Sequence, residues 1–152
     1  MSVEERLQEL GVVLPEVRPP LAVYRPAVRS GNLVYVSGQL PTRDGEMVHP
    51  GTLGVDVSVE QGYEAARVAT INALAAAKSV LGSLEGARIV RVVGYVASAP
   101  GFHDQPAVVN GGSELLRDAF GEERGVGARL ALGVASLPAR SSVEIELILE
   151  VA

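Results

Sequence analysis

The sequence predicts an α+β domain, with one mixed sheet and two helices packed on one face of that sheet. Strand-like segments rich in valine and isoleucine are interleaved with two helix-like segments, in the order ββ(β)αβαββ. The last strand-like segments alternate in a way that gives the sheet one strongly apolar face, and such a face needs a helical cover. The length of 152 residues and the hydrophobic content of 47% suit a single domain with a substantial core.

The beginning of the chain predicts a short helix, an irregular stretch and two strands. Residues 3–10 favour a short helix, and the prolines within residues 12–20 exclude regular structure there. Residues 22–28 and 33–37 have the composition of strands, and the turn-forming residues 29–32 join them.

The first long helix has the clearest boundaries. Ser58 and Gln61 have the spacing of a capping box, and Gly82 marks the C-terminal end. The alanine-rich stretch 73–77 favours a helix by propensity. The valine-rich stretch 88–98 that follows predicts a strand.

The second helix is predicted from Asp104, a capping residue followed by Pro106, to Gly121. Residues 110–112 (Asn-Gly-Gly) interrupt it, although each glycine costs about 1 kcal/mol relative to alanine in a helix. We therefore expect another part of the protein to pack close to this backbone. The alternative is a helix that begins only near Ser113.

The last two strands, residues 128–137 and 143–151, alternate between two faces. The short connection 138–141 predicts that they pair as an antiparallel hairpin. One face of the first strand carries Leu130, Leu132 and Val134, and the other carries Arg129, Ala131, Gly133 and Ala135. In the second strand Val143, Ile145, Leu147, Leu149 and Val151 share a face opposite Glu144, Glu146, Ile148 and Glu150.

We expect the helices to cover the face with Leu130 and Val143, which leaves Arg129 beside small residues on the other face. Small side chains next to a charge leave space that suits a ligand or a second subunit. The alternative is a lone surface arginine. Glu144 is expected on the same face as Arg129 but roughly 20 Å away along the hairpin, so a joint role would need Glu144 of a neighbouring chain.

Composition excludes several kinds of chemistry. The chain has no cysteine, and its two histidines, His49 and His103, are far apart, so we expect neither thiol chemistry nor a metal site. Lys78 is the only lysine. A net charge of −5 without a basic run argues against nucleic-acid binding. No apolar run could cross a membrane, and the polar N-terminus differs from a secretory signal, so a cytoplasmic location is expected.

Several short motifs together resemble the YjgF/RidA family, over residues 22–151. They are Ser37-Gly38-Gln39-Leu40-Pro41 preceded by Gly31-Asn32, then Asn110, Ala128-Arg129, Leu137-Pro138 and Val143-Glu144-Ile145-Glu146. The resemblance implies a chorismate-mutase-like fold and a homotrimer, with the sheets lining a central barrel and three clefts between subunits. Residues 1–20 would be an N-terminal extension, and residues 21–152 would form the family domain.

Members of the RidA type hydrolyse reactive enamines and imines to 2-oxo acids and ammonia, without a metal or cofactor. The resemblance implies that Arg129 grips the substrate carboxylate, which suits the planar fork of a guanidinium. It also implies that Tyr24 lies near the imine end and that Glu144 positions the attacking water. Ser37, Gly38 and Asn110 would line the cleft.

This chain also departs from the family pattern. Ala131 occupies the position, two residues after Arg129, where the deaminases usually have a cysteine, so the resemblance implies that it lines the substrate cleft. Residues 121–127 and 97–105 indicate a distinct subgroup. Phe102 is expected either to wall the cleft or to pack in the core. Tyr35, Tyr63 and Tyr95 fall in periodic apolar patterns and are expected in the core.

Three functions remain open at this point. The first is an enamine/imine deaminase that uses Arg129. The second is a non-catalytic trimer that binds a small carboxylate metabolite in the same cleft. The third is ribonuclease action, a label that family members often carry, but the acidic balance and the scarcity of histidine argue against it.

Overall fold

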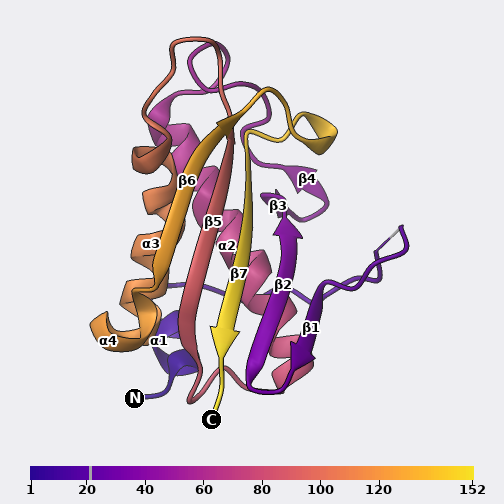
Figure 1. The fold of residues 1–152 in the computed structure, drawn as a ribbon, viewed down its shortest axis with the longest axis vertical. Helices are drawn as coiled ribbons and strands as arrows, with labels where there is room; N and C mark the ends of the chain where they lie inside the picture. Colours follow the sequence, from indigo (N-terminus) through magenta and orange to yellow (C-terminus); the bar gives the residue numbers. More distant parts are fainter. Residues whose placement is uncertain (21) are drawn as a thin grey trace.

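The computed structural model describes residues 1–20 and 22–152 and contains a five-stranded mixed sheet in the order β1-β2-β7-β5-β6 (Figure 1). The strands are β1 (Ala27–Ser30), β2 (Leu33–Gln39), β5 (Arg88–Ala97), β6 (Ala128–Val134) and β7 (Val143–Glu150), and β3 (Thr42–Arg43) and β4 (Glu46–Met47) form a separate hairpin. The helices are α1 (Val3–Glu9), α2 (Val59–Leu81), α3 (Gln105–Phe120) and α4 (Glu122–Gly125), with the 3-10 turn η1 (Pro138–Arg140). The predicted α+β class is confirmed.

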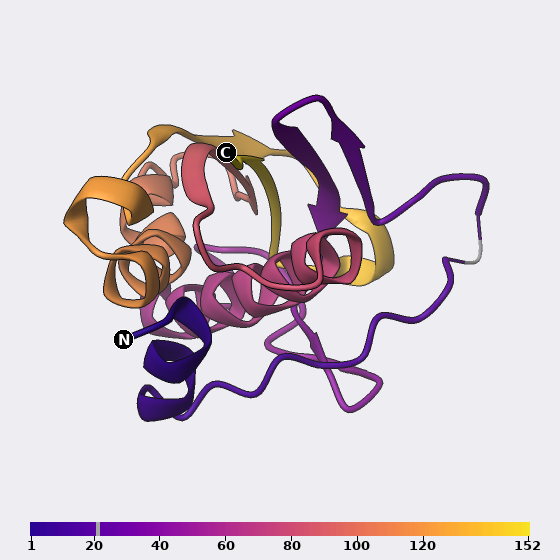
Figure 2. The same cartoon turned by 90° about the horizontal axis from the view of Figure 1, so that it is seen from below.

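Helices α2 and α3 lie side by side on one face of the sheet (Figure 2). The predicted ends of α2 are confirmed. Ser58 and Gln61 form both hydrogen bonds of the capping box, and Gly82 ends the helix with a φ of 82°. The buried side of α2 consists largely of alanines, so its backbone can approach the sheet and α3 closely.

Helix α3 continues through residues 110–112, as first predicted, and the alternative start near Ser113 is wrong. A Cβ atom on Gly111 would lie 1.9 Å from the carbonyl oxygen of Tyr63, and one on Gly112 would lie 2.3 Å from Oγ1 of Thr70. Both of those residues belong to α2. The two glycines therefore allow the backbones of α2 and α3 to meet, which is the close packing expected from the sequence.

The predicted hairpin of the last two strands is wrong. Strand β6 lies at the edge of the sheet and pairs in parallel with β5, whereas β7 lies between β2 and β5 and is antiparallel to both. The connection is short enough for a hairpin, but Ala139 and Arg140 have positive φ angles of 55° and 57°. They form η1, which carries the chain from the edge of the sheet to its middle.

The expected faces of β6 are also reversed. Arg129 donates hydrogen bonds to Asn110 and Ser113 of α3, whereas Leu130 points to the other face and is 45% exposed. Arg129, Ala131 and Gly133 thus face α3. Ala135 was expected with them but follows the end of the strand. The small residues leave room for the helix rather than for a second subunit.

The prediction for β7 is confirmed, because Val143, Ile145, Leu147 and Leu149 are all buried beneath the helices. Glu144 therefore lies on the uncovered face of the sheet, opposite Tyr95. The expectation that Glu144 shares a face with Arg129 is wrong.

The first strand is shorter than predicted. Residues 22–26 precede β1 and lie outside the sheet, and Pro26 has no N–H group for a strand ladder. The expected domain start at residue 21 lies outside the described residues, so the division into extension and domain stays a prediction. Val3 and Leu7 of α1 are buried in the same hydrophobic core as the sheet.

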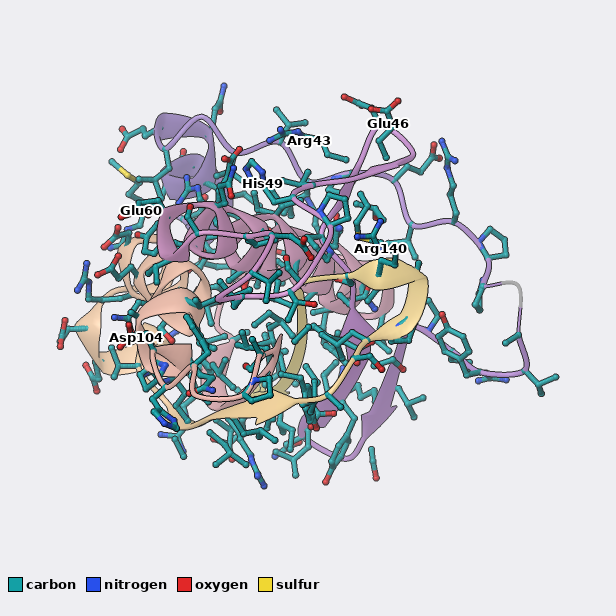
Figure 3. The ribbon with its side chains drawn as sticks, turned by 90° about the horizontal axis from the view of Figure 1, so that it is seen from above. Arg43, Glu46, His49, Glu60, Asp104 and Arg140 are labelled. Atoms are coloured by element: carbon teal, nitrogen blue, oxygen red, sulfur yellow. The ribbon has the colours of Figure 1, made fainter. Side chains whose placement is uncertain are left out.

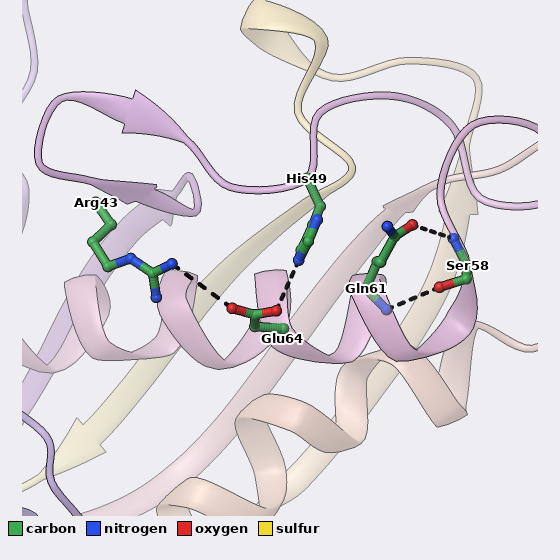
Figure 4. A network of polar contacts seen from close by, with 5 residues as sticks. All are labelled: Arg43, His49, Ser58, Gln61 and Glu64. Atoms are coloured by element: carbon green, nitrogen blue, oxygen red, sulfur yellow. Dashed lines mark hydrogen bonds and ion pairs between the residues drawn. The ribbon is translucent and has the colours of Figure 1, made fainter.

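Glu64 of α2 holds the segment between β2 and α2, which includes the β3–β4 hairpin, against this helix. The Glu64 carboxylate lies 2.8 Å from Nε2 of His49 and 3.7 Å from Nη2 of Arg43 (Figure 4). The hydrogen bond from His49 lowers the pKa of Glu64; partial burial opposes this, and the charges of His49 and Arg43 add to it. Figure 3 views this end of the molecule, with Glu60 near the start of α2.

A carboxylate of α1 fastens the N-terminal helix to the turn after α2. Glu4 accepts hydrogen bonds from the backbone N–H of Leu84 at 2.7 Å and the hydroxyl of Ser83 at 3.0 Å. Partial burial raises the pKa of Glu4, but the hydrogen bonds outweigh it, and the net pKa is below its ordinary value of 4.5. The folded state therefore binds this proton less readily than the unfolded state.

Glu4→Gln is expected to lower the free energy of unfolding at pH 7 by roughly 1 kcal/mol, because a charge-assisted hydrogen bond is replaced by a neutral one. This stability is present above the unfolded pKa and is lost as the pH falls through the lower, folded pKa. Urea unfolding at pH 7 and at pH 3 would measure both effects. Glu9→Gln, an exposed change in the same helix, is the control and should leave the pH dependence unchanged.

Candidate functional site

Arg129, the second residue of β6, presents an exposed guanidinium beside α3. Its Nη1 donates to Oδ1 of Asn110 at 2.6 Å and to Oγ of Ser113 at 3.3 Å. No other partner of this guanidinium occurs among the described residues, and the side chain is solvent-exposed. We call Arg129, Asn110 and Ser113 the arginine cluster. Its free N–H groups could bind a carboxylate with two parallel hydrogen bonds.

The backbone contact between α2 and α3 positions this cluster. Asn110 directly precedes Gly111, whose Cα lies against the carbonyl oxygen of Tyr63. Ser113 follows three residues after Asn110, so both side chains leave the helix on the same side. The two oxygen acceptors that orient the guanidinium are therefore held by the main chain of a buried helix.

A β-bulge shapes a second group of residues on the uncovered face. Val36 pairs with Leu147 but Gln39 pairs with Ile145, so β2 has one extra residue around Ser37 and Gly38. A Cβ atom on Gly38 would lie 2.8 Å from Cδ of Glu144. We call Ser37, Gly38 and Glu144 the glutamate cluster.

Burial, and then the neighbouring charge of Glu146, raise the pKa of Glu144 above its ordinary value. Glu146 itself accepts a hydrogen bond of 2.8 Å from the hydroxyl of Tyr95, and this bond raises the pKa of Tyr95. Glu144 is thus a half-buried carboxylate that binds a proton more readily than an exposed one does. Such a group is suited to accept a proton from water.

Tyr24 lies in the chain segment that leads into β1, directly before Arg25. The hydroxyl of Ser37 donates to the carbonyl oxygen of Arg25 at 2.6 Å, which fastens this segment to β2. Tyr24 itself is 54% exposed, so its ring is available to another molecule.

The two clusters lie on opposite faces of the sheet. Arg129 faces α3, and the strand register places Glu144 on the face that no helix covers. Within a single chain they therefore cannot act on the same small molecule.

The family model described as "YjgF/chorismate mutase-like, putative endoribonuclease" matches residues 4–151. The chain belongs to the YjgF family. "Protein TCP17" of Trypanosoma cruzi is 39% identical to this YjgF-family chain over 149 residues, which cover 97% of the chain and 93% of that protein.

Two solved structures resemble this YjgF-family chain over almost its whole length. Protein Atu1372 of Agrobacterium tumefaciens, described as being of unknown function, is 44% identical, with a TM-score of 0.92 and coverage of 99% of this chain and 92% of that one. A putative endoribonuclease of Shewanella oneidensis MR-1 is 33% identical, with a TM-score of 0.94 and coverage of 99% and 100%. The mixed sheet with its helices is the YjgF fold.

Two further predicted site residues of this YjgF-family chain, Phe102 and Ala131, belong to neither cluster. Phe102, in the loop between β5 and α3, packs against the core and lies close to Gly54. Ala131 is partly buried against the core beneath α3. Their roles in a site stay predictions. Ser113 is the member of the arginine cluster that the sequence interpretation missed, although its spacing from Asn110 was a signal.

The uncovered face of the sheet carries several exposed apolar side chains. Val28, Tyr35 and Leu130 are 47%, 46% and 45% exposed, so the expectation that Tyr35 lies in the core is wrong. Tyr63 and Tyr95 are partly buried and donate hydrogen bonds to Glu114 and Glu146. A hollow of about 370 Å³ on this face is lined by Val28, Tyr35, Val36, Ser37, Arg91, Val93, Glu146, Leu147 and Ile148.

Within residues 1–20 and 22–152, no three potential metal ligands of the histidine, aspartate or glutamate type converge. No helix in the same part of the chain is long and apolar enough to cross a membrane.

Proposed function

We propose that this protein hydrolyses 2-imino acids and their enamine tautomers to 2-oxo acids and ammonia, in clefts between the subunits of a homotrimer. The observation that carries the proposal is the exposed guanidinium of Arg129, which Asn110 and Ser113 orient while its other N–H groups stay free. A fork held in this way suits the carboxylate of a small metabolite.

The separation of the two clusters supports a site that is shared between two copies of the chain, with the arginine cluster from one copy and the glutamate cluster from the other. Arg129 and Glu144 lie on opposite faces of one chain, so they can meet only when copies associate. The exposed apolar residues of the uncovered face favour such an association, because a patch of this kind is commonly buried in an interface. The arginine cluster of one copy would then face the glutamate cluster of the next.

The reaction needs little beyond orientation. Arg129 holds the substrate carboxylate, and Glu144 accepts a proton from a water molecule as the water oxygen bonds to the imine carbon. The C–N bond then breaks, the nitrogen leaves as ammonia with the added protons, and the carbon retains the oxygen as the 2-oxo group. The raised pKa of Glu144 makes it a better base for this step than an exposed carboxylate.

The second candidate is a non-catalytic protein that binds a small carboxylate metabolite in the same cleft. The arginine cluster supports this function equally, because binding requires only the fork of Arg129. This chain has Ala131 where the deaminases usually have a cysteine, and this difference favours the non-catalytic function.

A coupled assay tests the proposal. A threonine dehydratase releases an imino acid, and its hydrolysis is followed with and without the purified protein. Wild type is expected to accelerate the decay, and Arg129→Ala to lose roughly 100-fold in kcat/KM, because the substrate carboxylate loses its charged partner. Arg124→Ala, at an exposed arginine of α4, is the matched control and should behave as wild type.

Absence of acceleration by folded wild type would contradict the deaminase proposal. Calorimetric binding of 2-oxo acids that disappears in Arg129→Ala would then favour the non-catalytic candidate. RNA cleavage that survives stringent purification and is abolished by Arg129→Ala would instead favour the nuclease activity in the family description.

A further inference from the structure

A row of residues continues from the arginine cluster along the seam between α3 and β6. On α3, Gln105, Val109 and Ser113 follow one another at intervals of four residues and so lie on one side of the helix. On β6, Arg129 and Gly133 face the helix. Ser113 contacts Arg129 at one end of the seam, and Gln105 lies against Gly133 at the other end.

The amide of Gln105 has a fixed orientation. Its Nε2 donates to the carbonyl oxygen of Phe102 at 2.9 Å and to Oγ of Ser98 at 3.2 Å, and the Ser98 hydroxyl in turn donates to the carbonyl oxygen of Val96. A carbonyl oxygen can only accept, so the amide nitrogen must point toward the loop. The amide oxygen is then the opposite end, and none of the hydrogen bonds among the described residues reaches it.

Gly133 makes room for this amide. A Cβ atom at that position would lie 2.9 Å from Nε2 of Gln105, closer than the side chain could accept without moving. Oε1 of Gln105 is therefore an oriented hydrogen-bond acceptor on the seam. Gly133 gives the amide room, the loop holds its nitrogen, and the residue is half-buried.

We propose that Oε1 of Gln105 selects substrates by accepting a hydrogen bond from their side chains, so that the protein favours short 2-imino acids whose side chain ends in an N–H or O–H donor. This inference rests on the proposed function, in which Arg129 holds the carboxylate. Asn110 and Ser113, which hold the guanidinium, lie about 7.5 Å and about 12 Å from Gln105 along α3. A four-carbon acid spans about 4 Å between its end carbons, and a hydrogen bond of about 3 Å at each end gives a reach of about 10 Å, which lies within this range.

The test compares two substrates of nearly equal shape. An amino-acid oxidase generates the 2-imino acids of asparagine and leucine, whose side chains differ in an amide against two methyl groups. Wild type is expected to have a kcat/KM about tenfold higher for the asparagine-derived substrate, because only that side chain can donate to Gln105. Gln105→Leu is expected to remove this preference.

Gly133→Ala is the second variant. It keeps the glutamine at position 105 but its added methyl group pushes the Gln105 amide out of its orientation, so it should also reduce the ratio of the two kcat/KM values. An equal loss for both substrates in Gln105→Leu, with an unchanged ratio, would mean that Gln105 only braces the loop and would overturn the inference.

A binding measurement separates this inference from the proposed function. If wild type hydrolyses neither substrate, calorimetry with the corresponding 2-oxo acids replaces the rate assay. A preference for the amide-bearing acid that disappears in Gln105→Leu would support the role of Gln105 without hydrolysis. Equal binding of both acids by wild type would refute it.

Discussion

Mixing two inactive variants, Arg129→Ala and Glu144→Gln, is expected to restore about one quarter of the wild-type activity when their subunits exchange at random in trimers. Each variant lacks one cluster in every copy. In the proposed homotrimer, a mixed assembly would contain one interface at which an intact Arg129 faces an intact Glu144. The expectation rests on that proposal and on the placement of the two residues on opposite faces of the sheet.

The measurement requires co-refolding or co-expression of the two variants, followed by the imine-hydrolysis assay. The control carries both substitutions in the same chain and is mixed with wild type. In the proposed shared-site trimer the fraction of intact sites then equals the square of the wild-type fraction, whereas sites that lie within single chains would follow the wild-type fraction itself. Two active single variants would exclude the shared site. Two inactive variants that remain inactive in proven mixed trimers would exclude it as well.

Gly111→Ala is expected to lower the free energy of unfolding by about 3 kcal/mol, since the added methyl group would overlap the carbonyl oxygen of Tyr63 and force α2 and α3 apart. The better helix propensity of alanine offsets this loss by only about 1 kcal/mol. Chemical unfolding measures the change. Asp118→Ala, at an exposed position of the same helix, should alter stability by less than about 0.5 kcal/mol. A Gly111→Ala protein as stable as wild type would show that the helices can separate without cost.

The helices could be predicted because their signals are local. Ser58, Gln61 and Gly82 act on the ends of α2 through hydrogen bonds within a few residues. The glycines of residues 110–112 predicted a close neighbour, and that neighbour is the backbone of α2. The identity of the neighbour could not be predicted, because it depends on how the whole chain packs.

The strand pairing could not be predicted because it depends on distant segments. The length of the connection 138–141 is compatible with both a hairpin and a crossover. Ala139 adopts a positive φ, but an alanine in the sequence does not indicate such a conformation. Alternation separates the two faces of β6 but does not say which face meets a helix. Here the face with small residues meets the helix, because α3 approaches β6 closely.

The candidate site was predictable in its residue types more than in its arrangement. The pairing of Arg129 with Asn110 agrees with the motifs that the sequence shares with its family. The orientation of Gln105 depends on the loop carbonyl of Phe102, and no sequence pattern reveals such a contact.

The position of β7 affects how the chain can fold during its synthesis. This strand lies in the middle of the sheet yet follows every other helix and strand in chain order. While a nascent chain ends before residue 143, the edges of β2 and β5 that will hold β7 have no partner. Exposed edges of this kind favour aggregation, so we expect the growing chain to be most prone to it until its central strand emerges.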